Sequence, residues 1–296
     1  MTESTPQLTR SDLEATIAEA AELHALPVVH METERVLTDP SSGAQDVAEL
    51  LATDPVLASR ALKMANSAHY GLSKRVGNLA QAIVVVGFQA VRNLILTVRV
   101  MESFRPGHQD AFDYPGFWAH SVATAMGASV IAERGSCPHA GDAYIIGLLH
   151  DVGKLIIVQH LPDYALTIEE CVEGGMPRLM AERTVIGCDH AEIGGRVAGI
   201  WKLPDVQIDA IQNHHQVLEG SEASLTDALQ LANILVQALG LGPGAAVLPE
   251  ASPGLSQRLG YDESCLSEWV EPIVRRFSDG KEYLDLTGWS CPMDQP

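Results

Sequence analysis

The segment from Gly147 to Lys154 places two polar residues at the end of an apolar helix. The apolar run from Ala143 to Leu149 predicts a buried helix, and His150 and Asp151 follow it directly. An imidazole nitrogen and a carboxylate oxygen that converge from a rigid support are ligands that a divalent metal prefers. The segment therefore predicts a helical core with a candidate metal site at the end of one of its helices.

The first half of the chain also predicts helices. Ser11 to Glu14 has the spacing of a capping box, and Asp54-Pro55 has a cap residue followed by proline at the first helical position. Helices over about 76–86 and 88–104 are expected to separate at Gly87. The β-branched run within the first of them favours a strand by composition, but the surrounding helical spacing outweighs it.

The second half predicts more helices and no alternation of strands and helices, so the expected fold is all-α. Approximate ranges are 114–133, 138–149, 153–159, 162–173, 180–186, 190–201, 204–213, 225–239 and 263–277. Pro272 is expected to kink or split the last helix. Asn66 is polar where an apolar helix face should continue, and we interpret it as a buried hydrogen-bonding cap on a neighbouring loop.

The charge balance limits the partners. The chain has 38 acidic residues against 19 lysines and arginines, a formal net charge of -19. Because nucleic-acid binding depends on neutralising phosphates, this balance argues against general DNA or RNA binding. It also disfavours an anionic membrane surface. We therefore expect neither nucleic acid nor membrane among the partners.

The cysteines and the N-terminus indicate a cytoplasmic protein. Five cysteines show no CxxC spacing and an odd count, which argues against a zinc ribbon and a disulfide framework. The polar N-terminus lacks the basic-then-apolar order of a secretory signal. No run approaches the roughly 18 apolar residues of a membrane span.

Four further histidines could join the His-Asp pair. They are His120, His190, His214 and His215, each at or near an expected helix end. With Asp151 as a bridging carboxylate, they could ligate one divalent metal or two. The alternative is that each histidine is a hydrogen-bonded core or surface residue, and spacing alone leaves both interpretations open.

These residues resemble a known family. The run His150 to Lys154, with His120 upstream and His214-His215 downstream, resembles the HD superfamily of metal-dependent phosphohydrolases. Residues 26–27, 50–57, 62–71 and 82–87 resemble one branch of it, the HDOD (HD-related output) domain. Residues 201–204 and 210–215 continue that pattern. The resemblance covers about residues 20 to 240.

The resemblance implies a bacterial signalling output module related to the HD-GYP phosphodiesterases, which hydrolyse cyclic di-GMP. It implies one metal held by the equivalents of His120, His150, Asp151 and a late aspartate. It implies a second metal held by Asp151 and the equivalents of His190, His214 and His215. The ions compatible with such nitrogen and oxygen ligands include iron, zinc, manganese and nickel. Lys154 is the candidate phosphate contact.

Two features depart from the enzymes. Asn233 stands where the resemblance places the late aspartate, and a neutral amide binds such cations more weakly than a carboxylate. The Gly-Tyr-Pro tripeptide is also absent, because Gln216 follows the double histidine. Both departures imply a degenerate site, whereas the retained histidines favour activity.

We expect two packed helical subdomains, residues 1–105 and 106–240, the second with an HD-type core. A Gly/Pro-rich loop and a C-terminal helix and tail should occupy 241–296, and a linker is expected at about 105–108. The function expected first is a regulatory module that binds a signalling protein or a small ligand such as a nucleotide. The alternative is a metal-dependent phosphohydrolase or phosphodiesterase acting on a nucleotide or cyclic dinucleotide.

Overall fold

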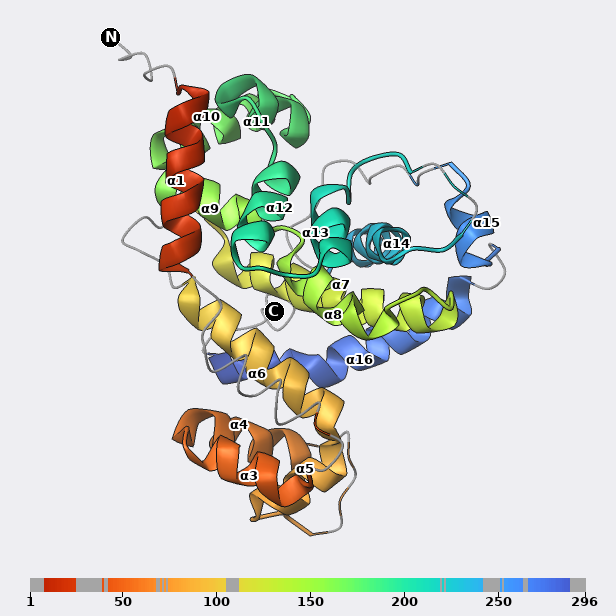
Figure 1. The fold of residues 1–296 in the computed structure, drawn as a ribbon. Helices are drawn as coiled ribbons and strands as arrows, with labels where there is room; N and C mark the ends of the chain where they lie inside the picture. Colours follow the sequence, from red (N-terminus) through yellow and green to blue (C-terminus); the bar gives the residue numbers. More distant parts are fainter. Residues whose placement is uncertain are drawn as a thin grey trace. The chain divides into compact units, whose positions relative to one another are not determined.

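The fold is all-α throughout the residues that the computed structural model describes, with no strand among them (Figure 1). Those residues are 8–24, 39, 42–67, 70, 72, 74–104, 112–218, 220, 222–241, 251, 253–262 and 266–287. The chain groups into two compact units, one of residues 1–25 and 106–273 and the other of residues 26–105 and 274–296. The all-α prediction is therefore confirmed.

The larger unit contains most of the helices. They are α1 (Arg10–Leu23), α7 (Tyr114–Arg134), the 3-10 turn η2 (Ala140–Asp142), α8 (Ala143–Leu149), α9 (Val152–His160), α10 (Pro162–Glu173), α11 (Arg178–Ile186), α12 (His190–Ile200), α13 (Asp205–Gln212), α14 (Leu225–Ala238) and α15 (Leu255–Leu259). Helix α7 is buried along nearly its whole length and packs against α8 and α14. A helix that is apolar on all sides is stable only when other helices bury it, so α7 forms the centre of this unit.

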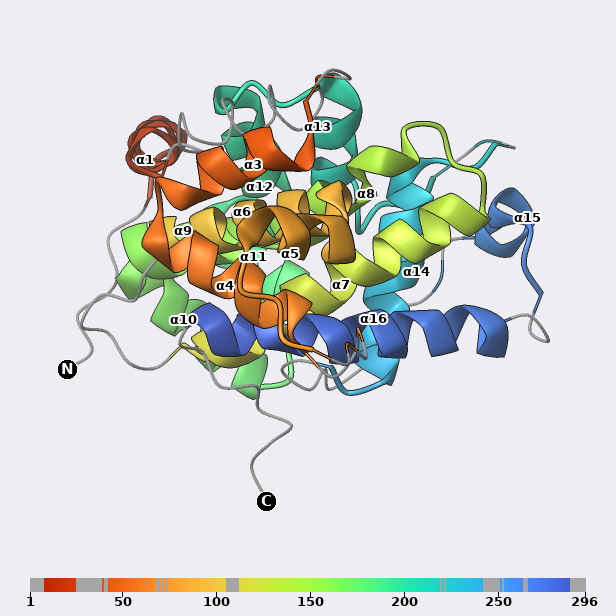
Figure 2. The ribbon, with the colours of Figure 1, turned by 90° about the horizontal axis from the view of Figure 1, so that it is seen from below.

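The smaller unit contains α3 (Ala44–Ala52), α4 (Pro55–Ala65), α5 (Leu79–Val86) and α6 (Phe88–Ser103), and Figure 2 shows α3, α4 and α5 together. Gly87 separates α5 from α6 with φ +85°, and the two helices meet at 105°. The predicted break is therefore confirmed. Glycine adopts this conformation without the steric cost of a Cβ atom.

Asn66 has the predicted role. Its side-chain amide donates to the carbonyls of Leu62 and Val76 at 2.7 and 2.8 Å, and its oxygen accepts from the Val76 N–H at 2.7 Å. One side chain therefore satisfies the end of α4 and both backbone groups of a loop residue.

Two local predictions were wrong. Ser11 lies inside α1, and the cap is Thr9, whose extended backbone lets its hydroxyl accept from the Asp12 N–H at 3.2 Å. The last helix, α16 (Leu266–Thr287), is not split at Pro272 and continues beyond residue 277, so the predicted split and end are wrong, while the alternative of a kink stays a prediction. Proline removes one backbone hydrogen bond there, and the bonds on either side carry the helix through it.

Several predictions fall outside the described residues. These are the segment at 26–27, the linker at 105–108, the start of the last helix at 263, and most of the loop at 241–254. Within the described part of the chain, no single helix is long and apolar enough to cross a membrane; α5 and α6 meet the length and composition test only when the bent pair is taken together.

Candidate metal centre

The His-Asp pair lies at the junction of two helices. His150 follows the last residue of α8, and Asp151 precedes the first residue of α9. Gly153 allows α9 to approach the start of α12, because a Cβ atom at this position would overlap the carbonyl of His190. The glycine of the sequence motif therefore brings Asp151 and His190 together.

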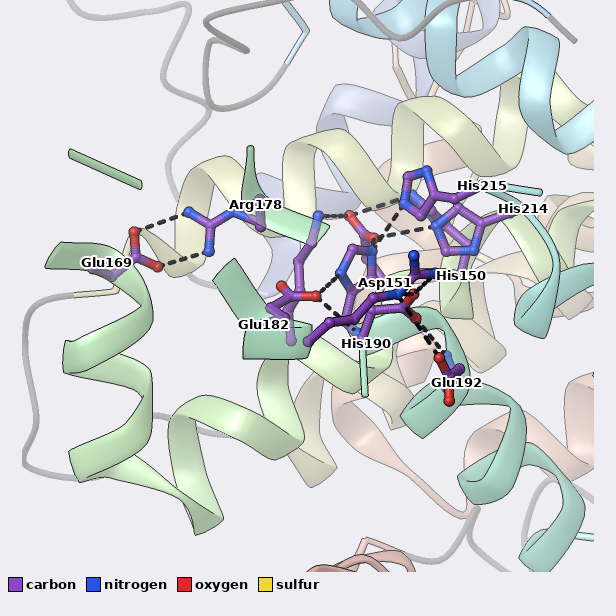
Figure 3. Close-up of polar contacts among 12 residues, drawn as sticks. His150, Asp151, Glu169, Arg178, Glu182, His190, Glu192, His214 and His215 are labelled. Atoms are coloured by element: carbon purple, nitrogen blue, oxygen red, sulfur yellow. Dashed lines mark hydrogen bonds and ion pairs between the residues drawn. The ribbon is translucent and has the colours of Figure 1, made fainter. Parts of the chain in front are cut away.

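The carboxylate of Asp151 lies at the centre of a buried cluster of imidazoles (Figure 3). Its Oδ1 lies 3.2 Å from Nε2 of His190 and 3.7 Å from Nε2 of His214. The Nε2 atoms of His190 and His215 are 3.0 Å apart. One oxygen of Asp151 thus faces a group of three histidines.

The second oxygen of Asp151 faces a different group. Its Oδ2 lies 3.3 Å from Nε2 of His150 and 3.8 Å from Nε2 of His120. The Lys154 ammonium donates to the same oxygen at 2.6 Å, one helical turn along α9. Asp151 therefore joins two groups of candidate ligands, as a bridging carboxylate would.

Backbone carbonyls orient two of the rings. Nδ1 of His150 lies 2.8 Å from the Gly147 carbonyl, and Nδ1 of His214 lies 2.7 Å from the Ile211 carbonyl. Because a carbonyl only accepts, each Nδ1 carries the hydrogen and donates it. In the neutral form of such a ring the lone pair is on Nε2, which faces the cluster.

Glu182 orients His190. Its Oε2 accepts from the ring Nδ1 of His190 at 2.7 Å and from the backbone N–H at 2.9 Å, and both side chains are buried (Figure 3). Carboxylate–histidine contacts of this kind support metal-ligating rings. The sequence analysis missed Glu182, because it belongs to no motif and its burial depends on how α11 packs.

His120 and His215 have the neutral protonation state that metal ligands need. Burial, together with His150, lowers the pKa of His120 to about 3. Burial, together with His190, lowers the pKa of His215 to about 2. Burial raises the pKa of Asp151, but His150 and Lys154 outweigh it and hold the pKa well below its usual value. These rings are neutral and the carboxylate is ionised at neutral pH, as metal binding requires.

His190 differs from these rings. Burial lowers its pKa, but the Glu182 carboxylate outweighs burial and the pKa is raised. A metal ion that takes Nε2 of His190 would therefore compete with a proton at that atom.

The donor set fits a divalent transition metal. Three buried atoms of the cluster have no hydrogen-bond partner among the described residues: Nε2 of His150, Oδ1 of Asp151 and Nε2 of His214. Leaving such an atom unsatisfied costs about 1–3 kcal/mol, and a shared cation would satisfy all three. Ligand atoms within 4.8 Å of one another form two groups, Asp151 with His190, His214 and His215, and Asp151 with His120 and His150.

The structure thus brings all six sequence-predicted ligand residues together, and their role as ligands stays a prediction. Asn233 lies buried on α14, where its oxygen accepts from Nε2 of Gln237 at 2.7 Å. Its side-chain oxygen is therefore already satisfied within its own helix.

Comparisons with known proteins identify the family of the chain. The HDOD domain model matches residues 23–217. An uncharacterised protein of Treponema pallidum (strain Nichols) is 27% identical over 243 residues, which are 79% of this chain and 46% of that protein. The chain therefore spans less than half the length of this curated relative.

Two solved structures cover nearly the whole chain. A Shewanella amazonensis SB2B protein, assigned provisionally as a phosphohydrolase, is 27% identical with a TM-score of 0.70, covering 92% of this chain and 98% of that one. An HDOD domain protein of unknown function from Geobacter sulfurreducens is 24% identical with a TM-score of 0.72, covering 93% and 99%. The second likeness shows the fold. Because the domain model matches more than half of its length, the chain belongs to the HDOD family.

Proposed function

We propose that this HDOD protein is a signalling output module whose buried cluster holds a divalent transition metal as a regulatory centre. The observation that carries the proposal is the set of three buried, unpartnered atoms on His150, Asp151 and His214. A folded protein rarely leaves several such atoms facing one another without a shared partner. Metal occupancy would change the affinity of the module for a partner protein or a small ligand.

The four-residue group offers more metal-ligand atoms than the three-residue group does. Asp151, His190, His214 and His215 offer one carboxylate and three imidazoles, a donor set suited to iron, zinc, manganese or nickel. The other group has only His120, His150 and Asp151. A full-affinity second site would need the carboxylate that Asn233 lacks, so we propose one tightly held ion.

Regulation is favoured over hydrolysis by the burial of the cluster. His150 is fully buried, and Asp151 and His190 are each 2% exposed. A nucleotide would not reach groups buried this deeply without movement of the side chains around them.

The second candidate function is phosphohydrolysis. It is supported by the likeness to the Shewanella protein, which is 27% identical and assigned provisionally to that class. A bound metal would supply Lewis-acid polarisation of a phosphoryl oxygen. The chain's own contribution would come from Lys154, whose ammonium lies 2.6 Å from Asp151 and could neutralise phosphate charge.

Metal analysis of the purified full chain tests the first proposal. We expect about one transition-metal ion per chain, and loss of that ion in His190→Gln. Metal-free protein after incubation with each of the four ions would overturn it. The loaded protein is then assayed on a panel of cyclic and linear dinucleotides, and turnover abolished by Lys154→Gln would support the hydrolase instead.

A pull-down with a signalling partner tests whether the bound metal controls that interaction or is only a structural remnant. His150→Ala should abolish a metal-dependent interaction and leave a metal-independent one intact.

Asn233→Asp supplies the missing carboxylate, and we expect it to raise the metal stoichiometry toward two. An unchanged stoichiometry would show that position 233 does not complete the three-residue group.

A further inference from the structure

A cavity of about 620 Å³ is lined by residues of α1, α10, α11 and α12 in the larger unit. Figure 1 shows where these four helices lie in the fold. None of the six candidate metal ligands is among its lining residues. Leu8 and Val185, both half-buried, supply accessible apolar surface, and Tyr164, Thr167 and Thr184 supply hydroxyl groups. Its volume lies within the roughly 300–1,000 Å³ of small-molecule sites. The cavity is large enough for a ligand and distinct from the metal cluster.

Two arginines from different helices converge at this cavity. Arg10 begins α1 and Arg196 lies on α12, and both line the cavity. Nε of Arg10 lies 3.5 Å from Oε1 of Glu14, and Nη1 of Arg196 lies 3.4 Å from the same oxygen. A single carboxylate oxygen can therefore meet both guanidinium groups. Glu14 does not itself line the cavity, whereas both of its arginine partners do.

Glu14 holds these arginines weakly. The Arg10 side chain is 85% exposed and that of Glu14 is 52% exposed, so solvent screens the attraction between them. An incoming anion with an apolar body would gain burial that Glu14 does not offer. Such a ligand could displace Glu14 from the two arginines.

The cavity also limits the charge of its ligand. Glu192 lies one helical turn before Arg196 on α12 and lines the same wall. Its carboxylate would repel a second or third negative charge nearby. A monoanion therefore suits this wall better than a polyphosphate.

We propose that this cavity binds a small amphipathic monoanion, with its carboxylate or sulfonate at Arg10 and Arg196 and its apolar body against Leu8 and Val185. This proposal is independent of the metal centre, since no lining residue is a candidate metal ligand. It assigns the chain a ligand site of its own for a small carboxylic acid.

The test uses 8-anilinonaphthalene-1-sulfonate, a fluorescent amphipathic monoanion, titrated into the metal-free full chain. We expect saturable binding that Arg196→Gln weakens about tenfold, the size of one lost charge-assisted contact. Glu14→Gln removes the internal competitor and should strengthen binding. Arg134→Gln, an exposed arginine at the end of α7 that does not line the cavity, is the matched control and should change nothing.

A second variant keeps the test independent of Arg196. Thr184 is exposed at the cavity, so Thr184→Trp should fill the space without disturbing the fold and should abolish probe binding. Octanoate should displace the probe, and the neutral analogue 1-octanol should do so at least tenfold less well. Probe binding that Thr184→Trp leaves unchanged, equal displacement by the two competitors, or no saturable binding would each overturn the proposal.

Discussion

Glu182 and His190, eight residues apart, are joined twice through one carboxylate oxygen. Oε2 of Glu182 accepts from the backbone N–H of His190 at 2.9 Å and from its Nδ1 at 2.7 Å. The first contact fixes where α12 begins, and the second fixes which face the imidazole presents to Asp151. One buried carboxylate therefore positions both the helix and its candidate ligand.

Glu182→Gln should weaken metal binding by about 10–100-fold, the range found when a carboxylate supporting a ligand histidine is lost. The amide oxygen can still accept one hydrogen bond, so the fold should be kept. Competition against a chromophoric chelator measures the affinity. Glu169→Gln, which removes an exposed ion pair with Arg178, is the control and should leave the affinity unchanged.

The metal-free protein should lose stability as the pH falls from about 6.5 to 4. The folded-state pKa values of His120 and His215 are lowered to about 3 and about 2, so the unfolded chain binds protons first. Each such histidine removes about 1.4 kcal/mol of unfolding free energy per pH unit in this window. His190 opposes the trend, because its pKa is raised and its contribution is present at low pH and is lost as the pH rises.

Urea unfolding of the metal-free protein at pH 7, 6 and 5 measures this dependence. His120→Gln removes one titrating ring and should reduce the slope by about 1.4 kcal/mol per pH unit. A stability that stays constant or rises toward pH 5 would contradict the assignment of these rings as neutral and buried.

Gly153→Ala should destabilise the larger unit by roughly 1–3 kcal/mol, the usual cost of an overpacked position. The added methyl group would overlap the backbone of His190, which cannot move as a flexible side chain would. The melting temperature and the metal affinity should fall together. Gly141→Ala is the matched control, because nothing lies within 4 Å of its added Cβ, and an equal loss there would argue against the close approach of α9 and α12.

Asn66→Ala should destabilise the smaller unit by about 1–3 kcal/mol, since it leaves the N–H and carbonyl of Val76 without their side-chain partner. Hydrogen exchange at the Val76 amide reports the loss directly and should become faster. Asn93→Ala, which removes only an exposed contact with Gln89, should leave that amide protected.

The sequence by itself determined the helical class and the six candidate ligands. Apolar spacing, proline, glycine and cap residues act within a few positions of one another, so they can be interpreted without the fold. The break at Gly87 belongs to this class and is confirmed. The polar residue Asn66 was also predicted as a cap, but its loop partner, Val76, lies ten residues away. The family motif added the expectation that distant histidines share one site.

Only the tertiary structure decided which groups support that site and where a second ligand could bind. Glu182 of α11 contacts His190 at the start of α12, and Arg10 and Arg196 share Glu14 because α1 packs on α12. These pairs are 8 and 186 residues apart, and neither spacing has a local signature. Side-chain burial and cavities arise from packing between helices that are distant in the sequence. The periodicity of a single helix therefore does not predict them.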